Sequence, residues 1–261
     1  MPDIKISQSF MKAYVDYATK QSCGAFFKAR YIDKDEEATT PTSDAMKLGI
    51  YFEYLCTGAL PRDGVVPEIE YAYKGQARER VSAPYLRAQQ SAELFHAIIK
   101  NYDIKIKEVG LKLSTNDMNG VVDIYADWAG KPVFIDLKYT GLIDDKWNES
   151  GWEINSLSLK DSLMVQGVHY KILAQECLGI ENIPFYFFVF SQTDPKNIKI
   201  IEENVDESRL EAHKSTVQVL LSKLPYERYE PLPTLFRCFQ CPLNHKCPHA
   251  VDYPLIERVD Y

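Results

Sequence analysis

Two short apolar runs separated by a turn limit most strongly how this chain can fold. The runs GVVDIYADW at 120–128 and VFIDL at 133–137 are rich in β-branched and aromatic residues, which favour β-strands. The residues between them, AGKP, have turn composition. A turn centred on Ala129 and Gly130 predicts an antiparallel hairpin whose paired residue numbers sum to 259.

This pairing places three charged side chains on one face of the hairpin. Asp123 stands opposite Asp136, and Lys138 shares their face because side chains two apart in a strand point the same way. Ile135 and Leu137 supply an apolar opposite face. A solvated outer face is one interpretation, but directly opposed carboxylates destabilise a sheet unless a cation neutralises them. Carboxylates suit Mg²⁺ or Mn²⁺, and a nearby lysine can orient or activate water.

A helix is predicted after the hairpin. Apolar residues recur with helical periodicity over 159–178, so Gln166 and Tyr170, four residues apart, share one face of that helix. Tyr170 could equally be a half-buried aromatic residue with no chemical role.

These motifs resemble those of the PD-(D/E)XK nuclease superfamily, in its RecB-like branch. The D-x(12)-D-x-K spacing of Asp123, Asp136 and Lys138 matches the catalytic hairpin of that superfamily. A Q-x-x-x-Y helix follows the hairpin in the RecB-like branch, and Gln166 and Tyr170 stand where that resemblance requires.

A shorter upstream motif belongs to the same resemblance. Gly49 and Glu53, in LGIYFEYL at 48–55, are similar to the first family motif in its G-x-x-x-E form. The family often carries a histidine in this helix and this chain has none there, so Glu53 is either a metal ligand or a helix-surface acid.

The resemblance implies a metal-dependent DNA nuclease, an exonuclease preferring single-stranded or end-containing DNA. Carboxylates and one backbone carbonyl would hold one or two Mg²⁺ or Mn²⁺ ions, the lysine would activate water, and the helix residues would orient substrate or lysine. The implied metal ligands are Asp123, Asp136, Glu53 and the carbonyl of Leu137. The other implied catalytic residues are Lys138, Gln166 and Tyr170.

Three cysteines, Cys238, Cys241 and Cys247, form C-x2-C-x5-C in a polar, proline-bearing segment. Thiols in such a segment have little packing role, whereas Cys56 and Cys177 lie in apolar periodic segments and are predicted core residues. The amino terminus carries no signal-peptide pattern, so we expect a reducing cytoplasmic location and no disulfide framework. Metal binding is therefore favoured.

The cysteine motif needs a fourth ligand, and two kinds are present. His245 or His249 would complete a Cys₃His zinc site, whereas Cys23 would complete a four-thiolate site. In iron-sulfur RecB-like nucleases, which include CRISPR-associated nucleases and AddB subunits, one cysteine precedes the nuclease core and three follow it. The resemblance therefore implies a [4Fe-4S] cluster that staples the chain ends, with Zn²⁺ as the alternative. Its ligands would be Cys23, Cys238, Cys241 and Cys247.

The chain of 261 residues, with 46% hydrophobic content, is long enough for one sizeable core. We expect helices at 7–31, 44–57, 84–101 and 206–223, with further strands at 104–113 and 183–190. The fold class is therefore α/β, with a central mixed β-sheet flanked by helices, and the resemblance implies a restriction-endonuclease-like core. The predicted organisation is a single nuclease domain over 1–261, comprising an amino-terminal helical segment (1–43), the nuclease core (44–225) and the cysteine segment (226–261).

The net charge of −7 is unusual for a protein that binds phosphates. A basic stretch at 74–80 and two tryptophans, Trp147 and Trp152 in the loop at 141–158, are candidate DNA contacts, because indoles can stack on unpaired bases. A solvated face and a fastened loop are the plainer interpretations. We also expect no membrane span, and a protein partner or homo-oligomer could help to hold DNA.

Two function classes stay open at this stage. One is the nuclease, in CRISPR adaptation, DNA repair and recombination, or phage genome processing. The other is a non-catalytic DNA-end binding or assembly module stabilised by an iron-sulfur cluster or by zinc.

Overall fold

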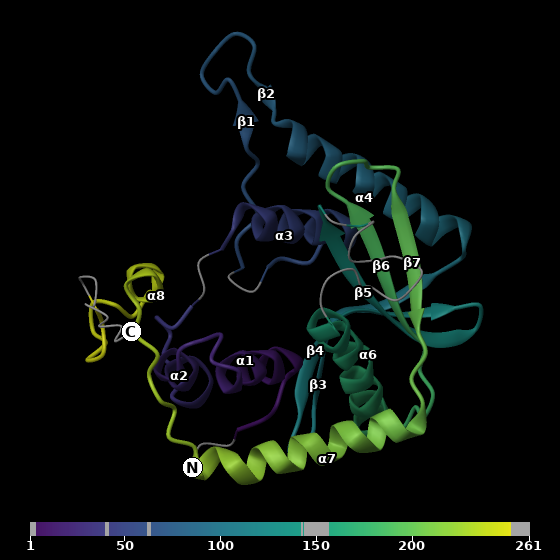
Figure 1. Ribbon diagram of the computed structural model, residues 1–261. Helices are drawn as coiled ribbons and strands as arrows, with labels where there is room; N and C mark the ends of the chain where they lie inside the picture. The colour runs from purple at the N-terminus through teal and green to yellow at the C-terminus, as the bar shows by residue number, and fades with distance from the viewer. Residues whose placement is uncertain (1–3, 40–41, 62–63, 142, 144–156, 252–261) are drawn as a thin grey trace. The chain divides into compact units, whose positions relative to one another are not determined.

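The computed structural model describes residues 4–39, 42–61, 64–141, 143 and 157–251 (Figure 1). Trp147 and Trp152 lie outside these residues. The chain forms two compact units, one of residues 42–214 and one that joins residues 1–41 to 215–261. Helix α7 (Glu207–Lys223) begins in the first unit and ends in the second.

The unit of residues 42–214 is built on a five-stranded sheet in the order β3-β4-β5-β6-β7. Strands β5 and β6 are parallel and the other neighbours are antiparallel, which confirms the expected mixed sheet flanked by helices. The strands are β3 (Lys105–Ser114), β4 (Asn119–Trp128), β5 (Lys131–Thr140), β6 (Phe185–Ser191) and β7 (Ile198–Glu203).

The β4–β5 hairpin has the predicted register. Trp128 pairs with Lys131 and Ile124 with Ile135, so paired numbers sum to 259. Ala129 (φ 54°) and Gly130 (φ 78°) form the turn, and two successive positive φ angles are the geometry that matches the twist of a tight hairpin.

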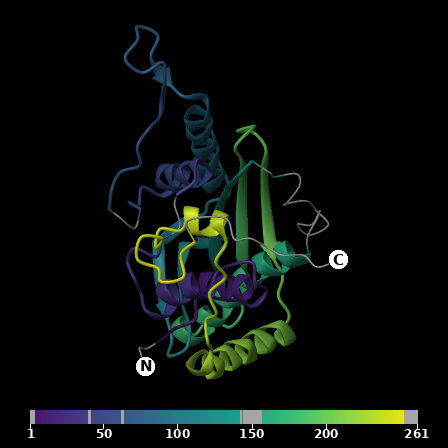
Figure 2. The same cartoon turned by 60° about the vertical axis from the view of Figure 1, so that its left-hand side comes forward.

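Helices α3 (Asp44–Thr57) and α4 (Ala83–Asn101) cover one face of this sheet (Figures 1 and 2). Helix α3 begins at the predicted cap, because the Ser43 hydroxyl accepts a hydrogen bond from the Met46 N–H, and it ends at Gly58 with φ 69°. The shared core is aromatic and aliphatic, and its most buried members include Phe52, Phe95, Ile124, Ile135, Phe188 and Phe190.

Helix α6 (Leu157–Leu178) links β5 to β6 and packs on the opposite face. The Tyr170 ring stacks on Phe185 with 5.8 Å between centroids. A Cβ at position 120 would lie 2.6 Å from Tyr170 Cε1, so Gly120 allows this close approach. On the same helix Cys177 is exposed, so its predicted place in the core is wrong, while Cys56 is buried as expected.

A two-stranded hairpin precedes α4. It consists of β1 (Tyr71–Ala72) and β2 (Arg80–Val81), and it projects beyond the start of α4 in both views (Figures 1 and 2). The basic side chains Lys74, Arg78 and Arg80 are exposed on it.

The second unit contains α1 (Gln8–Ala18), α2 (Gly24–Phe27), a π-helical turn η1 (Lys28–Ile32), the 3₁₀ turn η2 (Leu224–Tyr226) and α8 (Leu235–Gln240). The predicted continuous helix at 7–31 is wrong, because the chain breaks after α1. Lys20 takes a positive φ of 59°, and Gly24 packs so closely that a Cβ there would lie 2.6 Å from the Tyr229 carbonyl carbon.

Aromatic rings form the centre of this unit. Phe27 stacks against Tyr17, Tyr31 and Tyr229 and meets Phe10 edge-on. The Tyr17 hydroxyl donates a 2.6 Å hydrogen bond to Glu227, and thereby joins the two chain segments of the unit. Within the described residues of either unit, no helix combines the length and apolar character needed to cross a membrane.

Candidate active site

Asp123 and Asp136, two of the three acidic residues of the hairpin, come together as the sequence predicted. Ile124 pairs with Ile135, and Asp123 and Asp136 are the next residues of the two strands on the side away from the turn. Both lie on the sheet face that α6 covers. The backbone N–H of Leu137 donates a 2.9 Å hydrogen bond to Asp123 Oδ2. This bond fixes one oxygen of Asp123 beside the backbone of the strand that carries Asp136.

Lys138 lies on the same face, beside Asp136. Its Nζ is 2.5 Å from Asp136 Oδ2, and the side chains of Lys138 and Asp136 are 29% and 5% exposed. Asp136 Oδ2 is buried and is held by the Lys138 ammonium group. A carboxylate oxygen has two lone pairs, so Oδ2 can accept from the ammonium group and still offer one lone pair to a cation.

Gln166 reaches the same carboxylate from α6. Its Nε2 donates a short hydrogen bond to Asp136 Oδ1, so the amide and Lys138 contact the two different oxygens of Asp136. Tyr170, which is predicted to act beside Gln166, instead donates a 2.7 Å hydrogen bond to the Val121 carbonyl and packs against the sheet. The structure thus places Gln166 at the carboxylates and Tyr170 against the sheet, with its hydroxyl on β4.

Burial and mutual repulsion make these carboxylates reluctant to ionise. Burial raises the pKa of Asp123 well above its ordinary value, and the neighbouring charge of Asp136 raises it further. Burial also raises the pKa of Asp136, against the lowering effect of Lys138. Burial lowers the pKa of Lys138, but Asp136 and Asp123 outweigh it, so the pKa is raised and the ammonium form persists. Two carboxylates share one lysine, which leaves the site short of positive charge.

Glu53 lies on the exposed side of α3, and its charge raises the pKa of both Asp123 and Lys138. It is therefore within electrostatic range of the site. Among the described residues, however, no three His, Cys, Asp or Glu side chains are arranged as a finished metal site. The roles of Glu53 and of the Leu137 carbonyl as metal ligands stay predictions. The opposed carboxylates of Asp123 and Asp136, buried beside a single lysine, are the feature that fits a divalent cation.

The cysteines predicted to bind a metal lie in the second unit. Burial raises the pKa of Cys241, and the nearby thiols of Cys247, Cys23 and Cys238 raise it further, so these three thiols lie within electrostatic range of Cys241. The Leu232 N–H donates a 3.3 Å hydrogen bond to Cys23 Sγ, and none of the six cysteines forms a disulfide. Four thiols are the kind of donor set that a thiolate-rich metal centre uses. In the described residues their positions do not form a finished metal site.

Of the two histidine alternatives, His245 already has other partners. The His245 ring lies against the Pro242 carbonyl through Nδ1 (3.1 Å), and its Nε2 is 3.1 Å from Glu37. Both ring nitrogens thus have partners other than a shared metal. This orientation favours Cys23 over His245 as the fourth ligand.

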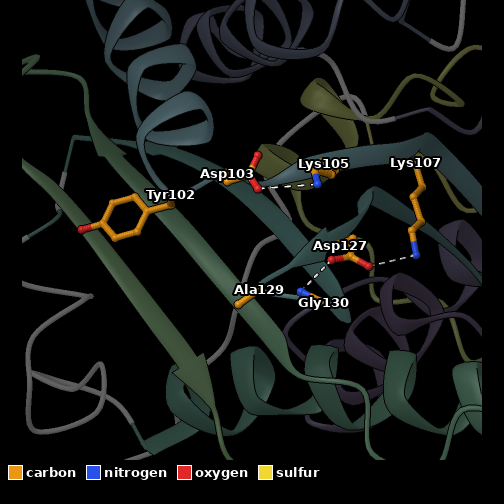
Figure 3. A pocket seen from close by; sticks show the side chains of 7 residues that line it. All are labelled: Tyr102, Asp103, Lys105, Lys107, Asp127, Ala129 and Gly130. Carbon is orange, nitrogen blue, oxygen red and sulfur yellow. Dashed lines mark hydrogen bonds and ion pairs between the residues drawn. The ribbon is translucent and has the colours of Figure 1, made fainter.

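A pocket of about 530 Å³ lies at the turn end of the β4–β5 hairpin (Figure 3). Its charges are already paired, with 3.5 Å between Lys105 and Asp103 and 3.5 Å between Lys107 and Asp127. The Gly130 N–H also donates to Asp127. Because these groups neutralise one another, the pocket is a weaker candidate than the carboxylate pair four residues along the strand.

The sequence did not predict one buried acid next to this site. Glu203, at the end of β7, accepts a 3.0 Å hydrogen bond from the Gly167 N–H, one residue beyond Gln166. The glycine in the middle of a predicted helix was the signal that something packs closely there.

No protein-family model matches the chain. No curated protein matches it either. Among solved structures, the crystal structure of a "Putative exonuclease" from Eubacterium rectale matches 99% of this chain and 91% of its own, with a TM-score of 0.63 and 18% identity. A second structure, named SSO0001, matches 63% of this chain and 69% of its own with a TM-score of 0.30 and 15% identity, too low to carry an argument. The first likeness shows a shared fold.

Proposed function

We propose that the unit of residues 42–214 is a metal-dependent nuclease of the PD-(D/E)XK type, RecB-like branch, that hydrolyses phosphodiester bonds of DNA. The observation that carries the proposal is the arrangement around Asp136, whose two oxygens contact Lys138 and Gln166 beside Asp123. Such a group of opposed acids and a lysine on one strand pair, with an amide from α6 against them, has no evident packing purpose, because its burial is costly.

The residues have distinct roles in this proposal. Asp123, Asp136, Glu53 and the Leu137 carbonyl hold Mg²⁺ or Mn²⁺, which supplies Lewis-acid stabilisation of the charge that develops on the phosphate. Lys138, whose ammonium is at the more exposed end of the group, orients the attacking water and offsets phosphate charge.

Gln166 acts on the carboxylate and does not reach for the substrate. Its hydrogen bond holds Oδ1 of Asp136 and leaves Oδ2 for Lys138 and the cation. Tyr170 supports it by anchoring α6 to β4.

We propose DNA ends or single strands as the substrate. The name of the protein from Eubacterium rectale supports an exonuclease, and the fold is shared over nearly the whole of both chains. The net charge of −7 makes long duplexes poor partners, whereas the exposed basic side chains of the projecting β1–β2 hairpin give local contacts for phosphates. Of these, Arg78 lies over the ring of Tyr73 at 3.9 Å.

The cysteine quartet is proposed to hold a [4Fe-4S] cluster, with Zn²⁺ as the second candidate. The effect of the Cys23, Cys238 and Cys247 thiols on the pKa of Cys241, and the absence of disulfides among the four, support a shared metal centre. Its role is structural, since Cys23 comes from one end of the chain and the other three from the other end.

The test is cleavage of end-labelled single- and double-stranded DNA by protein purified without oxygen, with and without Mn²⁺ or Mg²⁺. Lys138→Ala should abolish metal-dependent cleavage and keep the fold. Lys107→Ala is the matched control, because Lys107 is also a strand lysine paired to an aspartate but lies on β3, beside the turn end of the β4–β5 hairpin. Cleavage by Lys138→Ala equal to that by Lys107→Ala would contradict the catalytic role of Lys138. A folded wild type that binds DNA ends without cleaving them would favour the non-catalytic assembly module.

A further inference from the structure

The turn of α6 that carries Gln166 has a glycine where a helix would ordinarily be stabilised by alanine. Gly167 lies inside a 22-residue helix, and glycine in such a position destabilises a helix relative to alanine. A Cβ at position 167 would lie 2.5 Å from the Cδ of Glu203. Glycine at this position makes room for a carboxyl group that reaches the helix backbone.

Glu203 is one of the most buried acids among the described residues, at 4% exposure. Its Oε2 accepts the hydrogen bond from the Gly167 N–H, and its backbone carbonyl accepts a 2.9 Å hydrogen bond from Lys171 Nζ. Its Oε1 is buried and has no hydrogen-bond partner among the described residues. Burying a carboxyl group with one unsatisfied oxygen is costly, so a purely structural explanation is incomplete.

Other contacts hold the next part of the same helix. The His169 ring lies 2.9 Å from the Asn119 carbonyl and 3.1 Å from the ring of His213, and Tyr170 bonds to Val121. These contacts dock α6 onto β4 without Glu203. The contact made by Glu203 is therefore not needed to attach the helix, and it acts on the position next to Gln166.

We propose that Glu203 is a positioning residue for the active site. By binding the Gly167 N–H it fixes the backbone next to Gln166, and so holds the Gln166 amide against Asp136. This inference rests on the proposed function for its catalytic consequence, but the placement of Gln166 can be measured without it.

The charge of Glu203 suits this role. Burial raises the pKa of Glu203 to about 8, with Asp136 contributing in the same direction and Lys171 opposing. The group is therefore mostly neutral near pH 7. A neutral carboxyl can accept the Gly167 hydrogen bond without adding negative charge behind the two aspartates.

A double-mutant cycle on cleavage tests whether Glu203 acts through Gln166. Glu203→Ala should lower kcat by roughly 10- to 100-fold and leave KM almost unchanged, as expected for loss of a group that orients a catalytic residue. Gln166→Ala should lower kcat similarly, and the double variant should be no worse than Gln166→Ala. Glu202→Gln is the matched control, because Glu202 is the exposed neighbour on the same strand. Losses that multiply in the double variant would overturn the proposal.

A second measurement does not depend on cleavage. In the wild type, the side-chain amide of Gln166 should give a shifted, exchange-protected NMR signal, assigned by its absence in Gln166→Ala. Gly167→Ala should move that signal and remove its protection, because the methyl group displaces Glu203. If the wild type does not cleave DNA but the signal behaves this way, the proposed function fails and the positioning role stands. A signal unchanged by Gly167→Ala and Glu203→Ala would overturn the positioning role itself.

Discussion

The two units of this protein hold their candidate sites in different ways. In the unit of residues 42–214, the carboxylates stand on strands whose other face is buried in a large apolar core that includes Ile135 and Leu137. In the other unit, the thiols of Cys238, Cys241 and Cys247 stand on a six-residue helix and the turns after it, with few buried apolar neighbours.

This difference indicates which interactions hold each site in its folded conformation. Burial of the apolar sheet face is large enough to hold opposed aspartates that repel one another. Short helices and turns cannot supply comparable burial, so a bound metal would contribute directly to folding of the cysteine segment. The carboxylate site should therefore survive loss of its metal, and the cysteine segment should not.

The largest expected effect is on activity in the sheet-based unit. Asp136→Asn should lower metal-dependent cleavage by roughly 10³-fold or more, because it removes charge that holds the cation. The substitution should not lower stability, because it removes the repulsion by Asp136 that partly raises the pKa of Asp123. Cleavage rates and thermal unfolding in the absence of metal check both parts. An inactive and unfolded variant would contradict the view that the sheet alone holds this site.

The next effect concerns the cysteine unit. Cys238→Ser should remove bound metal and lower the free energy of unfolding of this unit by roughly several kcal/mol, so that residues 215–251 become sensitive to protease. Metal content, visible absorption and limited proteolysis are the measurements, and visible absorption separates iron-sulfur from colourless zinc. Cys177→Ser is the control, because Cys177 is exposed on α6. Unchanged metal content in Cys238→Ser would contradict the view that a metal bound by Cys238 holds the cysteine segment.

A pH effect on stability is expected from Glu203 in the sheet-based unit. The pKa of Glu203 is raised to about 8, so between about pH 4.5 and pH 8 the unfolded chain loses a proton that the folded chain keeps. The contribution of Glu203 to the free energy of unfolding is therefore fully present below about pH 4.5. It is lost as the pH rises toward 8, by at most about 1.4 kcal/mol per pH unit. Glu203→Gln should remove that slope in denaturant unfolding measured from pH 5 to pH 8. Equal slopes in the two proteins would show that Glu203 is ionised in the folded state.

The smallest effect is at the hairpin turn. Ala129 takes a positive φ of 54°, which costs an L-residue more than glycine. Ala129→Gly should raise stability by about 0.5–1 kcal/mol in chemical denaturation, with cleavage unchanged. A loss of stability would mean that contacts of the alanine methyl outweigh the strain.

The sequence predicted the features of the fold and of the candidate site that depend on local residue patterns. The alternation in the hairpin determined the register and brought Asp123 opposite Asp136, and the Ser43 cap placed the start of α3. The Gln166 and Tyr170 spacing predicted a shared face, but not that the two side chains would take different partners.

The parts that the sequence did not predict depend on residues distant along the chain. The break after α1 is imposed by the approach of the chain at 229–230 to Gly24, more than two hundred residues away. The contact of Glu203 with Gly167 requires β7 to be placed next to β6, which no local pattern signals. Cys177 sits at the end of α6, where periodicity continues but burial does not.

The most direct test of the central claim is the affinity of the carboxylate pair for a cation. Calorimetric titration of Mn²⁺ into the wild type and into Asp123→Asn, both with the cysteine metal retained, measures it without any substrate. We expect saturable binding of Mn²⁺ to the wild type and at least roughly tenfold weaker binding to Asp123→Asn, because one of two opposed carboxylates is lost. Equal affinities in the two proteins would contradict it.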